Sequence, residues 1–481
     1  MQDTQMTQSS HDLLRRIAEL DPESPPQAVV DIFGTDQLHI TDTVRADGTP
    51  IRCIHLDGMI DDLEWQNSTL PRITASSGAL QLCLPTARLA TTVGEAQYAL
   101  LHGCVMISDA QGTVTYKLPG MPDREVDEPS TERAVFGAKE AFIESLEKNI
   151  TLVRRHLRDP RLRVQRLSLG RDARTAVAVL AISGVAQDTV VADVIRRLRT
   201  NDQERVGFIS ALLTPLYGIS WSPFVKADFS ERPDRTADQL CRGRVAILMD
   251  GSPFAMVVPQ TFTDIFRGEE SEQHAIATHT FVRTLRMLAF YLAVLAPGMY
   301  VAVLSVNTAV LPGLLAIAVA ASRLPIAYPL FTETLVMLVM MDIMAEATVS
   351  MKGVLGPAIS IVGSLIIGQA AVRASLASNL AVILISLTAL STFVTPRYYV
   401  TYAYRIWKYP ILIVSGMFGI TGWTIGLLML AIHLISMRSI GIPYTVPVAP
   451  FRPHQALAQS ALSSISETDP DFYRRAEDEW R

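Results

Sequence analysis

The sequence has few cysteines and none of the short motifs by which many enzymes are recognised. Its 481 residues include four cysteines, Cys53, Cys83, Cys104 and Cys241, without a CxxC or Cys/His metal pattern. It contains no Walker motif, HExxH, GxSxG or EF-hand loop. The net charge of −5 gives no sign of a nucleic-acid partner. We therefore predict a protein that is not an enzyme, needs no cofactor or metal, and does not bind nucleic acid.

The N-terminus lacks the basic region and following apolar stretch of a secretory signal peptide. We therefore expect the N-terminal region to stay in the cytoplasm and the first apolar helix to act as the targeting signal. Residues 1–25 are predicted to be a polar leader with one short amphipathic helix over 12–20. Residues 446–481 are predicted to be a flexible tail.

Charge is scarce in one long part of the chain. Between Leu288 and Ile435 only nine residues are charged, and apolar runs of this kind are typical of transmembrane helices. The second run is short and the fourth contains Pro357, Gly363 and Gly368, so both are candidates for re-entrant segments. We predict a helical membrane domain over 276–445 with four to six spans. The six runs are 285–306, 310–321, 326–345, 354–372, 376–394 and 411–435.

The predicted spans place both termini on one side of the membrane. The large N-terminal region makes that side the cytoplasm. A loop over 397–408, with Arg397, Arg405 and Lys408, then lies outside, against the positive-inside tendency.

The polar part before residue 276 alternates between β-rich and helical patterns. A first α/β subdomain is expected over 26–128, with strands at 29–33, 38–44, 51–56, 103–108 and 113–118. The proline-rich stretch 119–129 separates it from a second α/β subdomain over 129–275. The predicted fold class is thus an α+β cytoplasmic region of two α/β subdomains, followed by an α-helical polytopic membrane domain.

The second subdomain has clear local signals. An apolar stripe predicts a helix over 139–158, ended by Pro160. A strand pair (163–169 and 175–182) and a helix capped by Asp188 follow, with Val191, Val194, Ile195 and Leu198 inward. A short helix over 236–241, stopped by Gly243, precedes a hairpin of 244–250 and 253–258 around Gly251-Ser252.

Ordered motifs over residues 50–450 resemble a known family, the A subunits of GerA-type spore germinant receptors, which include the SpoVAF proteins. The pair ERPD and DGSPF at this spacing is the most specific element of the resemblance. The matching segments are Cys53–Asp61, Glu128–Arg133, Ala141–Leu146, Asn149-Ile150, Arg154-Arg155, Glu231–Asp234, Gly243–Leu248, Asp250–Phe254, Glu346-Ala347, Ile361–Gly363, Gly368–Val372 and Gly441–Tyr444.

The resemblance implies a spore germination protein of the spore inner membrane, with both termini cytoplasmic. Such A subunits work with a transporter-like B subunit and a lipoprotein C subunit, and are thought to form a homo-oligomeric, ligand-gated ion channel in the lipid bilayer. The SpoVAF branch resembles an accessory channel that amplifies the signal. A secondary transporter and a non-conducting scaffold are the alternatives.

The sequence departs from the family pattern near the fourth run. Arg373 and Ser375 stand where the family usually has Glu and Gly, and residues 268–274 replace an acidic-Tyr-Tyr motif. These changes bear on cation selectivity and indicate a divergent member.

Ionisable and polar groups in the apolar runs are the candidates for pore lining or gating, because such groups usually face a cavity or a partner. Each has an ordinary alternative: interface anchoring for Glu333, the water boundary for Glu346, helix packing around Gln369, and a loop cap for Asn307. Glu333 and Asp342 are nine residues apart and should not share a helix face. Arg373 is expected at a pore mouth, favouring anions, or paired with Asp342 or Glu346. The candidates are Asp342, Glu333, Glu346, Gln369, Arg373 and Asn307.

The family motifs of the soluble part are candidates for fold maintenance or subunit coupling rather than for ligand binding. Asp250-Gly251 fits turn chemistry, and Arg232 with Asp234 fits a structural ion pair. The residues are Glu231, Arg232, Asp234, Asp250, Gly251, Asn149 and Arg154.

Overall fold

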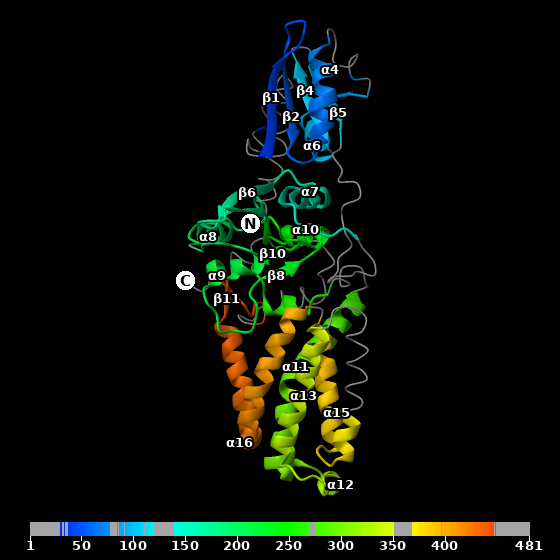
Figure 1. Ribbon diagram of the computed structural model, residues 1–481, viewed down its shortest axis with the longest axis vertical. Helices are drawn as coiled ribbons and strands as arrows, with labels where there is room; N and C mark the ends of the chain where they lie inside the picture. The colour runs from blue at the N-terminus through cyan, green and yellow to red at the C-terminus, as the bar shows by residue number, and fades with distance from the viewer. Residues whose placement is uncertain are drawn as a thin grey trace, which may run out of the picture. The chain divides into compact units, whose positions relative to one another are not determined.

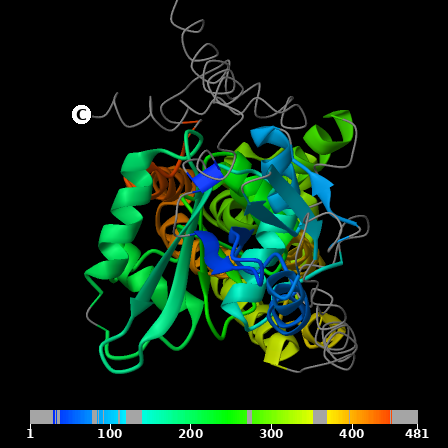
Figure 2. The same ribbon diagram turned by 90° about the horizontal axis from the view of Figure 1, so that it is seen from above.

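The computed structural model divides into two compact units, shown in two views in Figure 1 and Figure 2. The first unit runs to Gly218 and includes Ala227–Pro259; the second comprises Ile219–Lys226 and the described residues from Gln260 onward. The predictions for 1–25, 119–129, most of the fourth run and the tail beyond 448 lie outside the described residues. These are 29–30, 33, 37–76, 84, 86–90, 92–109, 112–118, 139–201, 203–268, 276–350, 368–395, 397–446 and 448.

The first unit begins with a five-stranded antiparallel sheet of order β1-β2-β4-β5-β3. Alternation along β2 sends Ile54 and Leu56 to the face covered by α6 (Val93–Leu101). Cys53 faces Trp65 and Ile73 on the other side, where α3 (Asp62–Glu64), η2 (Trp65–Thr69) and α4 (Leu70–Thr74) lie. The strands are β1 (Leu38–Val44), β2 (Pro50–Leu56), β3 (Arg88–Leu89), β4 (Cys104–Asp109) and β5 (Gly112–Lys117).

The predicted strands of this sheet are confirmed except the first. Val29, Val30 and Phe33 are helical, not extended. Val29 and Phe33, four residues apart, both pack into the core beside Leu38. That i, i+4 spacing is typical of a helix. An apolar run this short fits a strand equally well, which is why a strand was predicted here.

A second antiparallel sheet has the order β6-β7-β9-β10-β8, and its long β6–β7 pair is visible in Figure 2. Helices α7 (Leu146–Leu157) and α10 (Pro233–Cys241) pack on it, and Leu240 shares a core with Val153 and Leu248. The remaining helices are α8 (Asp188–Arg199), η3 (Ile209–Leu212) and α9 (Leu213–Tyr217). The strands are β6 (Leu162–Leu169), β7 (Thr175–Ile182), β8 (Asp228–Ser230), β9 (Val245–Met249) and β10 (Ala255–Val258).

The predicted strand pair and hairpin of this sheet are confirmed, and details of three helices are corrected. Helix α7 starts at Leu146 rather than at residue 139, and it ends at Leu157 with Arg158 left-handed (φ 45°), before Pro160. Asp188 lies in the first turn of α8, after Gln187 at the N-cap. The inward residues there are Val190, Val194 and Leu198, with Val191 and Ile195 half-buried. Helix α10 begins at Pro233, and Gly243 (φ 78°) follows its end as predicted.

The second unit is a helical bundle in which α11 (Ile276–Val301) packs against α15 (Asn379–Phe393) and α16 (Tyr398–Ser436). Helix α13 (Leu330–Ser350) lies beside α15. An aromatic core at one end of the bundle joins α11 and α16 to the segments around them. It contains Phe224, Phe262, Phe266, Phe290, Tyr404 and Tyr444. The short elements are η4 (Phe262–Phe266), η6 (Ala302–Val306), η7 (Thr308–Val310), α12 (Gly313–Arg323), β11 (Arg438–Ser439) and β12 (Ile442–Pro443).

Helix α16 is a helical hairpin, not one straight span. Gly419 has non-helical torsion angles (φ 62°, ψ −138°), and the chain reverses there. The rings of Trp407 and His433 are 5.0 Å apart, although one straight helix would separate these residues by about 39 Å. The prediction of a single span over 411–435 is therefore wrong.

Both ends of this hairpin lie at the end of the bundle where α11 begins, called here the α11-start end. Arg397 donates to the carbonyl of Asp264 at 2.9 Å. The side chain of Gln260 donates to the Tyr399 hydroxyl, and its backbone N–H to Ser439 Oγ, both at 3.2 Å. The predicted loop over 397–408 is thus wrong: from Tyr398 it is helix, and Arg397 lies next to the segment that leads into α11.

Two described helices are long and apolar enough to cross a membrane, Thr280–Val306 and Tyr399–Ser436. The second of these is the hairpin. Helix α12 has 11 residues, or about 16 Å, which is too short for a crossing. It lies at the end of the bundle opposite the α11-start end, with Leu314 and Leu324 strongly exposed.

Candidate functional site

A cluster of charged side chains joins α13 to the first half of α16. Lys408 Nζ lies 2.7 Å from Asp342 Oδ1, and the Tyr409 hydroxyl donates to Asp342 Oδ2 at 2.5 Å. Arg405 Nη1 lies 3.1 Å from Glu346 Oε2, and its Nε lies 3.9 Å from Asp342 Oδ1. We call these five residues the α13–α16 charge cluster.

The cluster forms because both helices present their charges at helical spacing. Asp342 and Glu346 are at i, i+4 on α13, and Arg405, Lys408 and Tyr409 are at i, i+3 and i+4 on α16, so each set occupies one face. The two acids were predicted from the sequence as candidates, but their partners were not, because the basic residues were expected in a loop. The i, i+3 and i+4 spacing of Arg405, Lys408 and Tyr409 is the sequence pattern that could have identified these partners.

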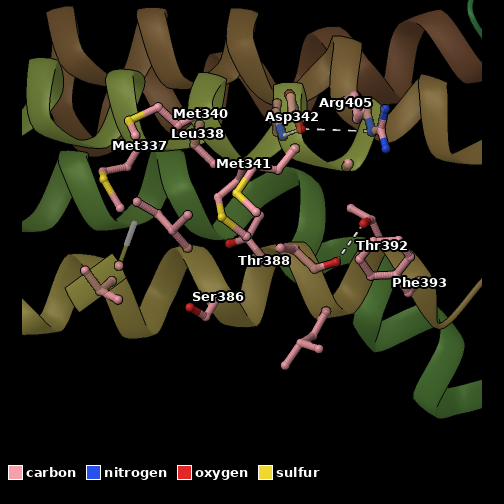
Figure 3. Close-up of a pocket in the computed structure, with 18 of the residues that line it drawn as sticks. Met337, Leu338, Met340, Met341, Asp342, Ser386, Thr388, Thr392, Phe393 and Arg405 are labelled. Atoms are coloured by element: carbon pink, nitrogen blue, oxygen red, sulfur yellow. Dashed lines mark hydrogen bonds and ion pairs between the residues drawn. The ribbon is translucent and has the colours of Figure 1, made fainter. Parts of the chain in front are cut away.

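A cavity of about 750 Å³ opens beside this cluster, between α13, α15 and α16. Figure 3 shows methionines of α13 facing α15, with Asp342 and Arg405 at one end of the cavity. Its polar lining from α15 includes Ser386, Thr388 and Thr392. The methionine wall consists of Met337, Met340, Met341 and Met344. Methionine side chains are flexible and polarizable, so this wall can change its shape to fit different atoms or molecules inside the cavity.

Gln369 and Arg373 line the same cavity. The structure thus brings three of the predicted residues, Asp342, Gln369 and Arg373, to one cavity. The predicted pairing of Arg373 with Asp342 or Glu346 does not form, because Lys408 and Arg405 occupy those carboxylates. Arg373 is exposed and contributes a positive charge to the wall.

Glu333 faces elsewhere, as its nine-residue separation from Asp342 predicts. It is buried beside a second cavity of about 430 Å³. Its Oε1 accepts the backbone N–H of Ser378 at 2.6 Å, at the N-terminus of α15. Its Oε2 lies 3.5 Å from Arg323 Nη2, at the end of α12. Because helix N-termini favour negative charge, this carboxylate ties α13 to α15.

Asn307 acts as a cap in the structure. Its Oδ1 accepts the backbone N–H of Ile420 at 2.9 Å, directly after the reversal at Gly419. A Cβ at position 419 would clash with the same oxygen, so the close approach requires glycine. Asn307 therefore fixes the tip of the α16 hairpin to the end of α11, and it lies apart from the 750 Å³ cavity.

In the first unit, three family motifs interlock through backbone hydrogen bonds. The Asn149 side chain bonds both backbone groups of Ile143, at 2.9 and 2.5 Å, and is fully buried. Asp250 Oδ1 accepts the N–H of Leu146 at 3.2 Å and so caps α7. The N–H of Gly251 donates to the carbonyl of Glu144 at 2.8 Å. Residues 139–145 form no regular secondary structure, and these contacts bind the backbone of 142–146 to groups elsewhere, which is why α7 starts later than its apolar stripe predicts.

The ERPD motif joins the same arrangement. The carbonyl of Glu231 accepts the N–H of Phe142 at 2.7 Å. Arg232 and Asp234 form the predicted ion pair, with contacts of 3.1 and 2.5 Å. We call these interlocked segments, 141–149, 231–234 and 250–251, the motif knot.

Arg154 connects the second sheet domain to the first. Its Nη1 donates to the carbonyl of Asp57 at 2.7 Å, and its Nη2 to Gln37 Oε1 at 3.2 Å. Burial lowers the pKa of Arg154 to about 10. Thr151 Oγ1 donates to the carbonyl of Gly58 at 3.1 Å, so two residues of α7 hold the Asp57-Gly58 turn.

The comparisons with known proteins agree with these motifs. The family model described as Bacillus/Clostridium GerA spore germination protein matches residues 33–467. The chain belongs to this family. It is 35% identical to Spore germination protein KA of Bacillus subtilis over 69% of this chain and 61% of that relative, so it spans less than two thirds of that relative's length. It is 34% identical to Spore germination protein GerLA of Bacillus cereus, over 75% and 74% of the two chains.

Another relative is the membrane protein YfkQ of Bacillus subtilis, 30% identical over 83% of this chain and 80% of that protein. A solved structure, the N-terminal domain of the A subunit of the Bacillus megaterium germinant receptor GerK3, matches at 21% identity with a TM-score of 0.37. The match covers 49% of this chain and 93% of that one. In this GerA family member the charge cluster is balanced, two acids against two bases, and Arg373 adds a further positive charge beside it.

Proposed function

We propose that this chain is a polytopic membrane subunit of a nutrient germinant receptor and oligomerises into a ligand-gated ion channel of the spore inner membrane. The α13–α16 charge cluster beside the 750 Å³ cavity is the observation that carries the proposal. Charged groups within apolar helices are expensive in a bilayer and typically mark an ion path or a gate. Family membership supports the role in spore germination.

In this proposal the cavity-facing residues form the conducting side of the subunit. The two acids are neutralised by Arg405 and Lys408, which leaves Arg373 as the net charge on the described cavity wall. A positive charge at a pore wall favours anions. We therefore expect a pore formed by this subunit to prefer cations over anions less strongly than a pore lined by acidic residues.

Family resemblance also supplies the proposed partners and orientation. A transporter-like B subunit would hold the nutrient site, a lipoprotein C subunit would complete the receptor, and both termini would be cytoplasmic. The motif knot and the Arg154 contacts would give the first unit the rigidity to pass a signal from those partners to the bundle.

The test is ion flux from dye-loaded liposomes that contain the purified protein. Wild type is compared with Asp342→Asn and Arg373→Glu, and Arg174→Glu, on an exposed site of the first unit, is the matched control. We expect Asp342→Asn to change the flux per oligomer and Arg373→Glu to shift selectivity toward cations, with the control unchanged. The absence of flux from an assembled oligomer would overturn the channel. Flux unaffected by both substitutions would overturn the residue assignment alone.

The discontinuous hairpin at Gly419 favours one alternative, a secondary transporter, because broken helices often build transporter sites. A transporter would move a solute in fixed proportion to an ion, whereas a channel would conduct down the gradient without a coupled solute. A SpoVAF-like accessory channel would conduct without a B subunit. The same liposomes, with and without a co-purified B subunit, separate these outcomes.

A further inference from the structure

Two large apolar side chains project into solvent from a short segment of the second unit. Ile219 is 91% exposed and Trp221 is 99% exposed, while Phe224, three residues later, is buried in the aromatic core. Tryptophan carries a large apolar surface with one polar N–H, and it is enriched at protein interfaces and in membrane-interface belts. The exposure therefore needs an explanation.

The segment that carries them is fixed to the bundle. Ser222 Oγ lies 2.8 Å from His433 Nε2 and 3.3 Å from Met437 Sδ. The carbonyl of Val225 accepts from the Tyr444 hydroxyl at 3.0 Å, and that of Lys226 from Ser439 Oγ at 2.7 Å. Trp221 is thus presented by a segment held through its neighbours.

The contacts also fix the level of Trp221 along the bundle. His433 is in the last turn of α16, and Met437 follows its end at Ser436. The apolar stretch long enough for a membrane also ends at Ser436. In the same last turns Ile432 and Ile435 are 66% and 50% exposed, so the exposed apolar surface of α16 continues to the level of Ser222.

We propose that Ile219 and Trp221 form an interfacial anchor that inserts into the headgroup region of the lipid bilayer at the α11-start end of the bundle. The inference rests on the membrane placement in the proposed function, but not on ion conduction. Tryptophan prefers the membrane–water interface, where its ring is in an apolar layer and its N–H remains hydrated. The site at the end of an apolar span meets that requirement.

The test uses a variant in which Trp65, Trp407, Trp423 and Trp480 are replaced by Phe, leaving Trp221 as the single tryptophan. The protein is reconstituted in phosphatidylcholine vesicles whose acyl chains carry bromine either close to the headgroup or close to the chain end. We expect a blue-shifted emission and loss of most of it with the shallow bromine, with a smaller loss with the deep bromine. A Trp221→Phe change in otherwise wild-type protein provides a second measurement, the difference in quenching between the two proteins.

Two emission outcomes would contradict the anchor. Emission typical of water without quenching would show that Trp221 stays in solvent. Blue-shifted emission without bromine quenching would show a protein contact, either another copy or a neighbouring segment. Flotation of the same vesicles separates the two proposals: protein absent from the vesicles overturns both, whereas integrated protein without ion flux overturns the channel alone. In that last case shallow quenching still supports the anchor.

Discussion

Lys408 and Asp342 form an ion pair of 2.7 Å in the most apolar part of the chain, with the lysine side chain only 3% exposed. The pair joins two helices that are 66 residues apart in sequence. The Lys408 ammonium is withdrawn from water, which costs free energy. The Asp342 carboxylate that faces it offsets that cost.

The first prediction concerns this pair. Asp342→Asn should destabilise the bundle by about 3–5 kcal/mol, because it leaves a buried lysine without its counter-ion. The double change Asp342→Asn with Lys408→Met should recover most of that loss. Thermal unfolding of the detergent-solubilised protein, analysed as a double-mutant cycle, measures the coupling. Equal losses in the single and double variants would show that the two charges do not depend on each other.

The second prediction concerns Glu333. Glu333→Gln keeps an acceptor for the N–H of Ser378 but removes the charge that faces Arg323 and the start of α15. We expect a loss of about 1–2 kcal/mol in the free energy of unfolding of the bundle. Glu346→Gln is the matched control, because that side chain is 53% exposed and exposed pairs contribute less than about 1 kcal/mol. A larger effect at Glu346 would contradict the assignment.

The third prediction concerns the motif knot. Asn149→Ala leaves two buried backbone groups of Ile143 without partners, which should cost about 2–4 kcal/mol. Asp250→Ala removes one cap of α7 and should cost about 1 kcal/mol. Urea unfolding, monitored by limited proteolysis within residues 139–157, measures the loss in the free energy of unfolding for each variant. The reverse order of the two losses would show that the knot is held mainly by the Asp250 turn.

The fourth prediction is a pH dependence of the first sheet domain. His55 is buried between the rings of His39 and Trp65, and burial followed by the charge of His39 lowers its pKa below the usual value of 6.5. The unfolded chain then binds a proton that the folded chain does not, so stability is full above pH 6.5 and falls as the pH drops below it. His55→Leu should flatten the dependence of the urea midpoint on pH between about 7.5 and 5.5. His102→Leu is the control, and an unchanged slope in His55→Leu would assign the pH dependence to other groups.

The fifth prediction concerns Ser375. This residue has φ 56° and follows the helical turn that ends at Arg373, with the N–H of Leu376 bonded to the carbonyl of Ala371 at 2.8 Å. That is the position at which helices prefer glycine, and a non-glycine residue there costs about 1–2 kcal/mol. Ser375→Gly should therefore raise the melting temperature of the bundle. Ser375→Ala, which keeps a Cβ, should not raise it, and a stabilisation by alanine would show that the hydroxyl rather than the backbone is unfavourable.

The sequence predicted the elements whose signal is local. The alternation in β2 and the turn at Gly251-Ser252 lie within a few residues, so the strands around them were placed correctly. The start of α7 could not be read in this way, because its position depends on Asp250, about a hundred residues away in sequence. Residues 139–145 carry a helical apolar pattern, but the backbones of Phe142, Ile143 and Glu144 bond to Glu231, Asn149 and Gly251 instead.

The candidate site was predicted only in part, because its residues come from segments far apart in the sequence. Asp342, Gln369 and Arg373 were chosen as polar groups in apolar runs, and they line one cavity. Their grouping with Arg405 and Lys408 was missed because these two basic residues were placed in a loop over 397–408, whereas they lie on the first half of α16, before the reversal at Gly419. Asn307 was found as a polar residue between two runs, but its role as a cap depends on Ile420, 113 residues later.

The reversal at Gly419 also determines the parity of membrane crossings. A helical hairpin whose two ends are held by Gln260 adds an even number of passes. In a bilayer, Arg397 and Tyr444 would therefore face the same compartment, whatever the number of spans before them. A reporter fused after residue 448 would accordingly give the side of the membrane on which the segment before α11 lies.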